Sequence, residues 1–255
     1  MNKLLFLIDY LIKENNYDIE LNEDIKSNEE ELYKYFRYLM NIRMPKNISE
    51  EYLNIEDEYL QERLKRKEIT NSEDIRPIKD NLCLWQGDIT TLKIDSIVNA
   101  ANSSMLGCFV PLHKCIDNAI HSAAGTRLRL YCNNIMKGKS EETGKCIITP
   151  GFNLPSKYIL HTVGPIIQNE VTKRDEKLLY ECYNSCLKTA KENNIKSIAF
   201  CCISTGEFKF PNELASKIAI DCASDFLNST KYDIKIIFNV FKDLDYKLYY
   251  NNLNN

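Results

Sequence analysis

Glycine is scarce in this 255-residue sequence and is confined to one part of it, because all eight glycines lie at or beyond Gly87. Histidine and tryptophan are rarer still, with three and one residues. No apolar stretch approaches the roughly 18 residues of a membrane-spanning helix. The short run from Leu4 to Ile8 ends at Asp9 without a cleavage site for secretion. We therefore expect a cytoplasmic protein that does not contact membranes.

Neither sign of charge predominates, with 33 Lys and Arg against 36 Asp and Glu. A net charge of −3 argues against a general nucleic-acid binder, which carries a basic excess. The balance shifts along the chain: residues 1–80 hold 13 basic and 19 acidic side chains, whereas residues 81–255 hold 20 and 17. A glycine-free acidic segment thus precedes a glycine-bearing, slightly basic one.

Residues 1–80 are predicted to form a helical extension packed on the main domain, which spans residues 81–255. Apolar residues recur there at helical spacing. Asn28 precedes three glutamates, which is the pattern of a capped helix start. The expected helices of this segment cover residues 4–12, 32–40 and 49–67.

Short apolar runs alternate with longer helical ones after Pro77, which indicates an α/β fold. The runs are apolar on both faces, as is typical of mostly parallel strands covered by helices on both sides. The expected strands are Leu82–Trp85, Ser96–Asn99, Cys146–Thr149, Tyr158–Val163, Ser197–Ile203 and Ile234–Val240. The expected helices cover residues 115–131, 175–193, 211–227 and 243–250.

Ten cysteines are many for this length, and without a secretory signal most are expected to be reduced thiols of the core. Cys108 and Cys115, however, share a stretch of eight residues with His113, in the loop after a predicted strand. Zinc prefers thiolate and imidazole ligands, and three ligands without an evident fourth are typical of a catalytic zinc. The spacing alone leaves this zinc site and two buried thiols beside a surface histidine as equal alternatives.

Three further stretches are expected at the carboxyl ends of strands, where α/β sheets bind ligands. They are Gly-Asp-Ile-Thr at 87–90, Asn-Ala-Ala-Asn-Ser-Ser at 99–104 and Ser-Thr-Gly-Glu-Phe at 204–208. Asparagine amides offer donors and acceptors to sugar hydroxyls, and the backbone N–H groups of a glycine-bearing loop can cradle phosphate. Taken singly, the first two stretches are better explained as ordinary turns, and the third is not a P-loop.

In this order the stretches resemble the macrodomain family, over about residues 83 to 241. The resemblance also rests on Ile-Asp-Asn-Ala-Ile-His-Ser-Ala-Ala-Gly at 116–125, Ile-Thr-Pro-Gly-Phe-Asn-Leu-Pro at 148–155 and Tyr-Ile-Leu-His-Thr-Val-Gly-Pro at 158–165. Most macrodomains carry a run of glycines where this sequence has Cys108, His113 and Cys115. That departure resembles the zinc-containing bacterial macrodomains, which also have an N-terminal helical extension.

The resemblance implies a three-layer α/β/α fold with a mixed, mostly parallel central sheet that binds ADP-ribose. It implies that Asp88 accepts a hydrogen bond from the adenine amino group, that Ile89 helps to form the adenine pocket, and that Asn99 and Asn102 contact the distal ribose. The diphosphate is expected on Ser204, Thr205, Gly206, Glu207 and Phe208, mainly through backbone N–H groups. Zn²⁺ is expected on Cys108, His113 and Cys115, and the expected catalytic residues are Asp117 and Asn102.

The implied function is a zinc-dependent hydrolase that removes mono-ADP-ribose from modified protein side chains, with Asp and Glu linkages expected, and releases ADP-ribose. In this hypothesis Asp117 orients or deprotonates the attacking group while Asn102 fixes the sugar. Two alternatives stay open: a non-catalytic ADP-ribose reader with a structural zinc, and an O-acetyl-ADP-ribose deacetylase. The resemblance also suggests that the partner is a lipoyl-carrier protein modified by a sirtuin-like ADP-ribosyltransferase.

Overall fold

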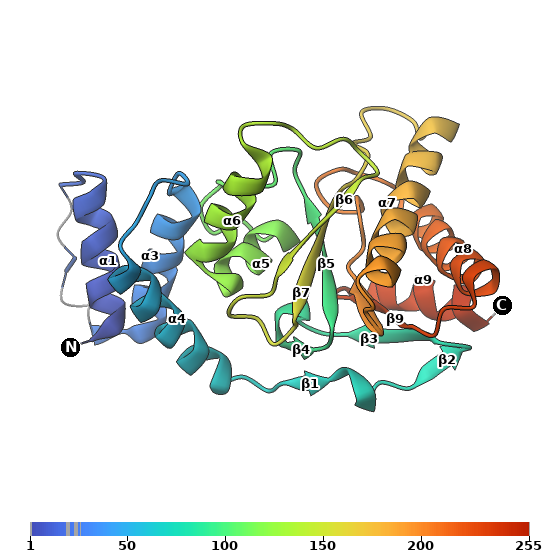
Figure 1. The fold of residues 1–255 in the computed structure, drawn as a ribbon, viewed down its shortest axis with the longest axis horizontal. Helices are drawn as coiled ribbons and strands as arrows, with labels where there is room; N and C mark the ends of the chain where they lie inside the picture. The colour runs from blue at the N-terminus through green and yellow to red at the C-terminus, as the bar shows by residue number, and fades with distance from the viewer. Residues whose placement is uncertain (1, 19–20, 23–24, 26, 255) are drawn as a thin grey trace.

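A seven-stranded sheet forms the centre of the molecule (Figure 1). The computed structural model describes residues 2–18, 21, 22, 25 and 27–254. The strands of the sheet are β2 (Pro77–Lys79), β3 (Leu82–Gln86), β5 (Ser96–Ala101), β6 (Cys146–Pro150), β7 (Tyr158–Val163), β8 (Ser197–Phe200) and β9 (Lys235–Val240). They lie in the order β2–β3–β9–β8–β5–β7–β6. Only the two outermost pairs, β2 with β3 and β6 with β7, are antiparallel, so the predicted mixed, mostly parallel sheet is confirmed.

Helices cover both faces of this sheet (Figure 1). One face carries α5 (Ile116–Ala124) and α6 (Thr126–Met136), and the other carries α7 (Lys173–Glu192), α8 (Asn212–Thr230) and α9 (Asp243–Asn254). The middle strands are accordingly apolar on both sides: Ile236, Ile237 and Phe238 follow one another in β9 and are all buried. Burial on both faces is what the three-layer arrangement requires.

The predicted helix over residues 115–131 is wrong as a single element. The chain breaks at Gly125, which has a φ of +92° and separates α5 from α6. A Cβ atom at Gly125 would lie 3.0 Å from Leu60 and 3.1 Å from Glu56, two residues that precede the main domain. Glycine is needed there because it accepts this backbone conformation and lets the neighbouring helix approach closely.

The strand predicted over Ser197–Ile203 is shorter in the structure, because β8 ends at Phe200. The chain then turns away from the sheet, and the backbone N–H of Thr205 donates to the Cys202 carbonyl oxygen at 3.4 Å. The apolar pattern continues past the strand because residues 201 and 203 are buried although they lie outside the sheet.

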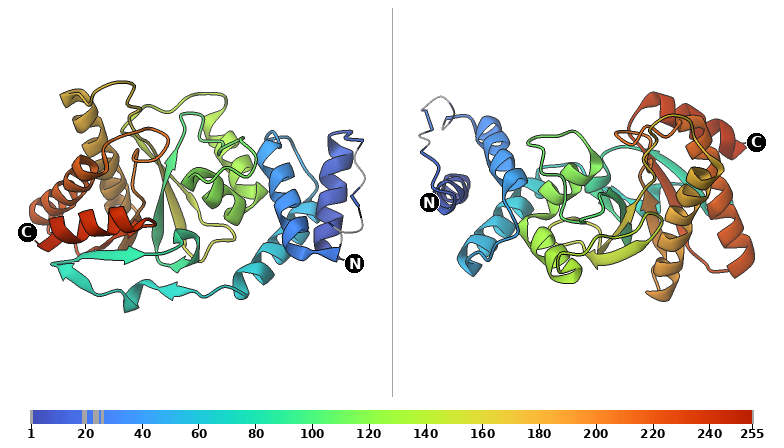
Figure 2. Two further views of the ribbon diagram at one scale, coloured as in Figure 1. Left: turned by 180° about the vertical axis from the view of Figure 1, so that it is seen from behind. Right: turned by 90° about the horizontal axis from the view of Figure 1, so that it is seen from above.

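Three helices of the N-terminal segment surround a core of their own. They are α1 (Lys3–Glu14), α3 (Glu29–Ile42) and α4 (Glu50–Lys65), and the predicted cap at Asn28 is confirmed by its side chain, which accepts from the backbone N–H groups of Glu30 and Glu31. Helix α3 lies against α5, and α4 lies against α6. The N-terminal helices thus form an outer layer on one side of the main domain (Figure 2).

Residues 66–81, which we call the strap, run from α4 along the lower edge of the molecule (Figures 1 and 2). Within the strap, β1 (Thr70–Asn71) pairs with β4 (Leu92–Lys93), and β2 pairs with β3 at the border of the main sheet. The first 80 residues are therefore not purely helical, since they supply two short strands to the part that follows. The division of the chain at residue 80 stays a prediction.

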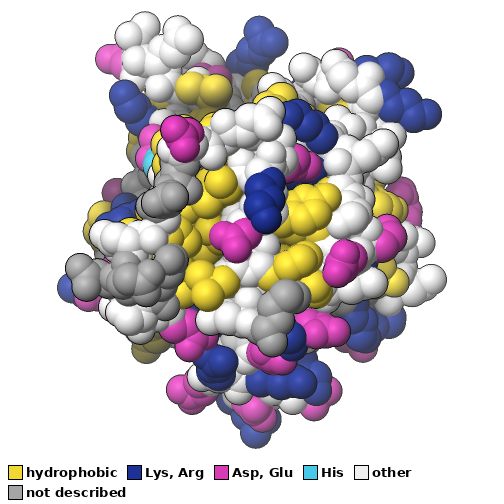
Figure 3. Space-filling view, turned by 90° about the vertical axis from the view of Figure 1, so that its left-hand side faces the viewer, with side chains coloured by type: hydrophobic (Ala, Val, Ile, Leu, Met, Phe, Trp, Pro, Cys, Tyr) yellow, Lys and Arg dark blue, Asp and Glu magenta, His cyan; other side chains and the backbone are white. Residues whose placement is uncertain are grey.

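The outward face of the N-terminal helices carries hydrophobic side chains in its middle, with charged side chains around them (Figure 3). Helix hydropathy is modest throughout the described part of the chain. No helix within it combines the length and the apolar content needed to cross a bilayer.

Candidate functional site

The loops that the sequence marks for ligand binding follow β3, β5 and β8, three parallel strands whose carboxyl ends share one edge of the sheet. The loop after β8 also touches the end of β7, since a Cβ atom on Gly164 would lie 2.0 Å from Ser204 Oγ. This edge is where α/β sheets bind ligands. The fold therefore brings the predicted stretches to one side of the molecule.

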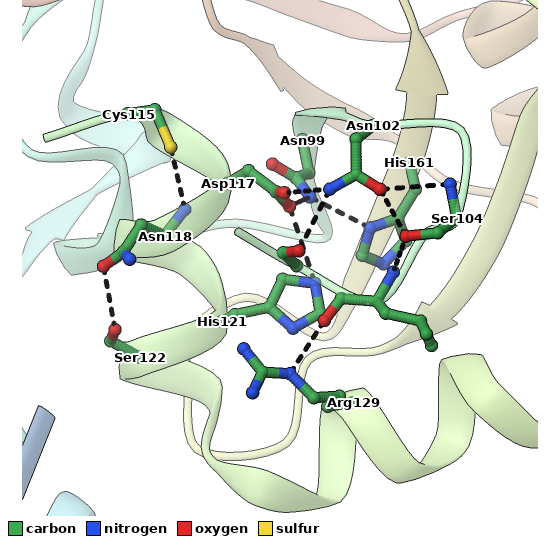
Figure 4. A network of polar contacts seen from close by, with 12 residues as sticks. Asn99, Asn102, Ser104, Cys115, Asp117, Asn118, His121, Ser122, Arg129 and His161 are labelled. Carbon is green, nitrogen blue, oxygen red and sulfur yellow. Dashed lines mark hydrogen bonds and ion pairs between the residues drawn. The ribbon is translucent and has the colours of Figure 1, made fainter. Parts of the chain in front are cut away.

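The carboxylate of Asp117 is the centre of a buried polar network (Figure 4). Asp117 lies in the first turn of α5 and is 4% exposed. Asn99 Nδ2 donates to its Oδ1 at 2.8 Å, and Asn102 Nδ2 donates to its Oδ2 at 3.1 Å. Two amides from β5 and the loop that follows it thus orient both oxygens of the carboxylate.

Both asparagine side chains are engaged within the protein. Asn102 Nδ2 also donates to the carbonyl oxygen of Gly107 at 3.0 Å, and Asn102 Oδ1 accepts from the backbone N–H of Ser104 at 3.0 Å. Asn99 is fully buried, and its Oδ1 has no hydrogen-bond partner. A buried polar atom without a hydrogen-bond partner needs an explanation. One explanation is that a bound ligand supplies the missing partner. Contact of either amide with a ribose stays a prediction.

Burial raises the pKa of Asp117 to about 6. The hydrogen bond from Asn99, the positive charge of Arg129 and the hydrogen bond from Asn102 each oppose that shift. The acid is therefore held in a position where its charge is unfavourable, which is common for groups that exchange protons in catalysis.

Two histidines lie close to this network. The ring of His161 contacts Asn99 Nδ2 at 3.1 Å through Nδ1 and the Thr149 hydroxyl at 3.0 Å through Nε2. His121 Nε2 lies 3.6 Å from Asp117 Oδ1, and neither ring nitrogen has a hydrogen-bond partner. Burial lowers the pKa of both rings, so both are neutral at pH 7.

The predicted metal ligands Cys108, His113 and Cys115 meet in the loop between β5 and α5. Their donor atoms all lie within 4.8 Å of one another. Cys115 is the N-cap of α5, and its Sγ accepts from the backbone N–H of Asn118 at 3.4 Å. Burial raises the pKa of the Cys115 thiol to about 12, so this thiol stays protonated at neutral pH unless a cation lies beside it.

The geometry of this cluster fits a zinc ion. A tetrahedral zinc bound at about 2.3 Å to sulfur and about 2.0–2.1 Å to nitrogen separates these two donors by roughly 3.6 Å. Cys108 Sγ and His113 Nδ1 are 3.5 Å apart. Two thiols and one imidazole are also the donor set that favours zinc over the harder cations Mg²⁺ and Ca²⁺.

The loop after β8 reaches this cluster through Glu207. Glu207 Oε1 lies 3.4 Å from His113 Nε2, the ring nitrogen that does not face Cys108. Histidines that bind metals commonly donate their second N–H to a carboxylate, which fixes the ring orientation. Although the sequence points to Glu207 for its backbone, its side chain therefore has a contact of its own.

The remaining residues of the loop after β8 form a tight turn. Ser204 has a φ of +64°, and its buried hydroxyl has no hydrogen-bond partner. The Thr205 hydroxyl donates to the Cys202 carbonyl oxygen at 3.1 Å, and Lys209 N donates to the Gly206 carbonyl oxygen at 3.0 Å. The Phe208 carbonyl oxygen accepts from the backbone N–H of Ile167 at 2.9 Å.

In the stretch after β3, the neighbouring residues Asp88 and Ile89 differ in their exposure. Asp88 caps a short 3₁₀ turn, and its Oδ1 accepts from the backbone N–H of Thr90 at 2.9 Å. Its other oxygen lies 3.3 Å from Lys67 Nζ, at the surface. Ile89 is buried in the core of the main domain. Asp88 is thus accessible at the sheet edge, whereas the accessible face of Ile89 is small.

Phe241, which directly follows β9, is a candidate binding residue that the sequence motifs did not indicate. Its side chain is 78% exposed, and its carbonyl oxygen accepts from Gln86 Nε2 at 3.2 Å. Since β9 lies beside β3, this exposed ring lies at the same edge of the sheet as Asp88. The signal was an aromatic residue at the carboxyl end of an apolar strand.

Comparisons with known proteins agree with this arrangement. Residues 98–219 match the Macro domain family. A protein-ADP-ribose hydrolase of Treponema medium is 50% identical over 252 residues, which cover 96% of this chain and 95% of the relative. A protein-ADP-ribose hydrolase of Staphylococcus aureus is 46% identical over 248 residues, which cover 95% and 93%.

A solved structure shares the fold. The Trypanosoma brucei macrodomain in complex with ADP-ribose is 31% identical and has a TM-score of 0.65, with 80% of this chain and 90% of that one covered. The resemblance expected from the motifs is confirmed by relatives that match this sequence along almost all of their length. On both sequence and fold, the chain belongs to the Macro domain family.

Proposed function

We propose that this protein is a zinc-dependent hydrolase that removes mono-ADP-ribose from protein side chains, with linkages to Asp and Glu as its substrates. The observation that carries the proposal is the position of Asp117 two residues after Cys115, so that one turn of α5 presents an acid–base group beside a metal ligand. The names of the Treponema and Staphylococcus relatives support the reaction class.

The order of the strands supports a binding mode for ADP-ribose along the carboxyl edge. Strands β3, β9, β8 and β5 are successive neighbours, and they lead to Asp88, Phe241, the loop 204–208 and the Asp117 network. This sequence of groups matches adenine, diphosphate and distal ribose in one extended ligand. An aromatic ring suits the base, and a glycine-bearing turn suits the diphosphate.

Hydrolysis adds water across the bond between the distal ribose and the carboxyl oxygen of the modified side chain. The attacking oxygen must lose a proton, and the carboxylate of Asp117 is the base that this site offers. Asn99 and Asn102 fix the direction of its lone pairs. Cys108, His113 and Cys115 would hold the zinc ion, which would supply a Lewis acid next to Asp117.

The proposal extends to the protein that carries the ADP-ribose modification. The partner expected from the family resemblance is a lipoyl-carrier protein that a sirtuin-like ADP-ribosyltransferase has modified. The side chains of Asp88 and Glu207 are both exposed along this edge, as suits a substrate that is attached to a protein surface.

The test is release of ADP-ribose from a protein that carries mono-ADP-ribose on a glutamate. We expect turnover by the zinc-loaded wild type and a loss of about 10²- to 10⁴-fold in kcat for Asp117→Asn, the range for removal of a general acid–base group. Binding of free ADP-ribose by the variant, followed by calorimetry, controls for an intact pocket.

The same preparations separate the alternatives. A reader module would bind ADP-ribose with zinc loaded and release none from the modified protein. A deacetylase would act on O-acetyl-ADP-ribose and leave the glutamate linkage intact. Zinc content near one ion per chain is expected, and purified wild type that takes up no zinc would refute the metal part of the proposal.

A further inference from the structure

The end of α3, in the N-terminal segment, is bonded to the metal-binding loop, which we define as residues 107–115. Asn41 is 1% exposed, and its Oδ1 accepts from the backbone N–H of Leu112 at 2.9 Å. Asn41 Nδ2 donates to the Ser122 hydroxyl on α5 at 3.1 Å. One buried side chain of the N-terminal segment thus joins the metal-binding loop to the helix that follows it.

The residue that Asn41 holds has an unfavourable backbone conformation. Leu112 has a φ of +54°, in the left-handed region that residues with a Cβ seldom occupy. It directly precedes the metal ligand His113. Such a conformation persists only where its surroundings hold it in place, and the hydrogen bond from Leu112 N to Asn41 is a contact that does so.

A second set of hydrogen bonds also links α3 to the metal-binding loop. Arg37, one turn before Asn41 on α3, donates from Nη2 to Asn118 Oδ1 at 2.8 Å. Asn118 Nδ2 in turn donates to the Val110 carbonyl oxygen of the metal-binding loop at 3.1 Å. The backbone N–H of Asn118 donates to Cys115 Sγ (Figure 4). Helix α3 therefore reaches the loop at two points on either side of Pro111.

Arg129, on α6, donates hydrogen bonds both to the end of α3 and to the residue before the metal-binding loop. Its Nη1 donates to the carbonyl oxygens of Met40 at 2.7 Å and Arg43 at 2.6 Å, where α3 ends. Its Nε donates to the Leu106 carbonyl oxygen at 2.7 Å, just before the metal-binding loop. A cation at the C-terminus of a helix is favoured by the helix dipole. The end of α3 is therefore fixed relative to the start of the loop.

We propose that Asn41 is a positioning residue for the metal site: by holding Leu112 N it fixes the direction of His113, and so makes the N-terminal segment a part of the zinc site's support. The inference rests on the zinc site of the proposed function and adds a role for α3, which contributes no metal ligand of its own. Loss of such a supporting contact typically weakens metal affinity by about 10- to 100-fold.

The experiment measures the zinc dissociation constant of the full chain by competition with a chromophoric chelator. Asn41→Leu keeps the number and branching of the side-chain heavy atoms and removes both hydrogen bonds, and we expect about 10-fold weaker zinc binding or more. Asn41→Asp keeps an acceptor for Leu112 N, and we expect zinc binding closer to wild type. Hydrogen exchange of the Leu112 amide in metal-free protein gives a second readout, with loss of protection in Asn41→Leu.

The matched control is Gln61→Leu. Gln61 also bonds the N-terminal segment to the main domain, and both of these hydrogen bonds go to Asn153, which lies outside the metal-binding loop. Zinc affinity near wild type is expected for it. Equal zinc affinity in folded Asn41→Leu and wild type would overturn the inference and leave the proposed function standing. Wild type that binds no zinc would instead overturn the metal site itself.

Discussion

Glu56 is a buried carboxyl group at the contact between α4 and α6, and it makes the stability of the protein depend on pH. It is fully buried and accepts from the backbone N–H and the hydroxyl of Thr126, at 2.7 and 2.8 Å, and from the Tyr52 hydroxyl at 3.2 Å. Burial raises its pKa from 4.5 to about 7, although these hydrogen bonds act in the opposite direction. The perturbation that tests this is Glu56→Gln, which removes the titration.

The sign and the size of this pH dependence follow from the linkage between proton binding and folding. Between pH 4.5 and 7 the folded protein holds a proton on Glu56 that the unfolded chain has released. Stability from this group is therefore fully present below pH 4.5 and is lost as the pH rises through 7. At about 1.4 kcal/mol for each pKa unit, the loss is about 3 kcal/mol, most of it between pH 5 and 8.

The assay is urea-induced unfolding of wild type and Glu56→Gln at a series of pH values from 5 to 8.5. We expect the free energy of unfolding of wild type to fall relative to that of the variant by about 2–3 kcal/mol across the series. Glu51→Gln, an exposed change on the same helix, is the control and should give a constant difference. A constant difference for Glu56→Gln as well would refute the reasoning.

Two further predictions concern the ligand edge. Glu207→Gln removes the carboxylate 3.4 Å from His113 Nε2, and we expect about 10-fold weaker zinc binding in the chelator assay. Glu213→Gln, an exposed change on α8, should leave zinc affinity unchanged. Phe241→Ala removes the exposed ring at the end of β9, and we expect about 10-fold weaker ADP-ribose binding by calorimetry, because a stacked base is worth about 1–3 kcal/mol. Phe241→Tyr should restore most of that affinity, and a Phe241→Ala variant with unchanged affinity would place the base elsewhere.

The sheet and the meeting of Cys108, His113 and Cys115 could be predicted because their signals are local. A strand such as β9 shows in the sequence as an unbroken apolar run, since both faces are covered. Cys108, His113 and Cys115 stand within eight residues, so a single loop suffices to bring them together.

The elements that were missed depend on residues far apart in the chain. Helical periodicity continues across Gly125, and the reason for the break is α4, which packs against that point. Asn41 acts on a residue 71 positions later, which no pattern within α3 could indicate. The side-chain role of Glu207 likewise depends on His113 from another strand's loop.

The strap has a consequence for how the chain can be divided. Strand β2 occupies the border of the sheet next to β3, and it is only three residues long and begins with Pro77. A short edge strand with a proline offers few free backbone groups to other molecules, which protects against aggregation. The amino-acid composition changes near residue 81. A truncated protein that starts there would lack β2 and expose the whole edge of β3. The outermost strand at this end of the sheet therefore belongs to the N-terminal segment. Removing that segment would leave unpaired backbone groups along β3 and favour aggregation.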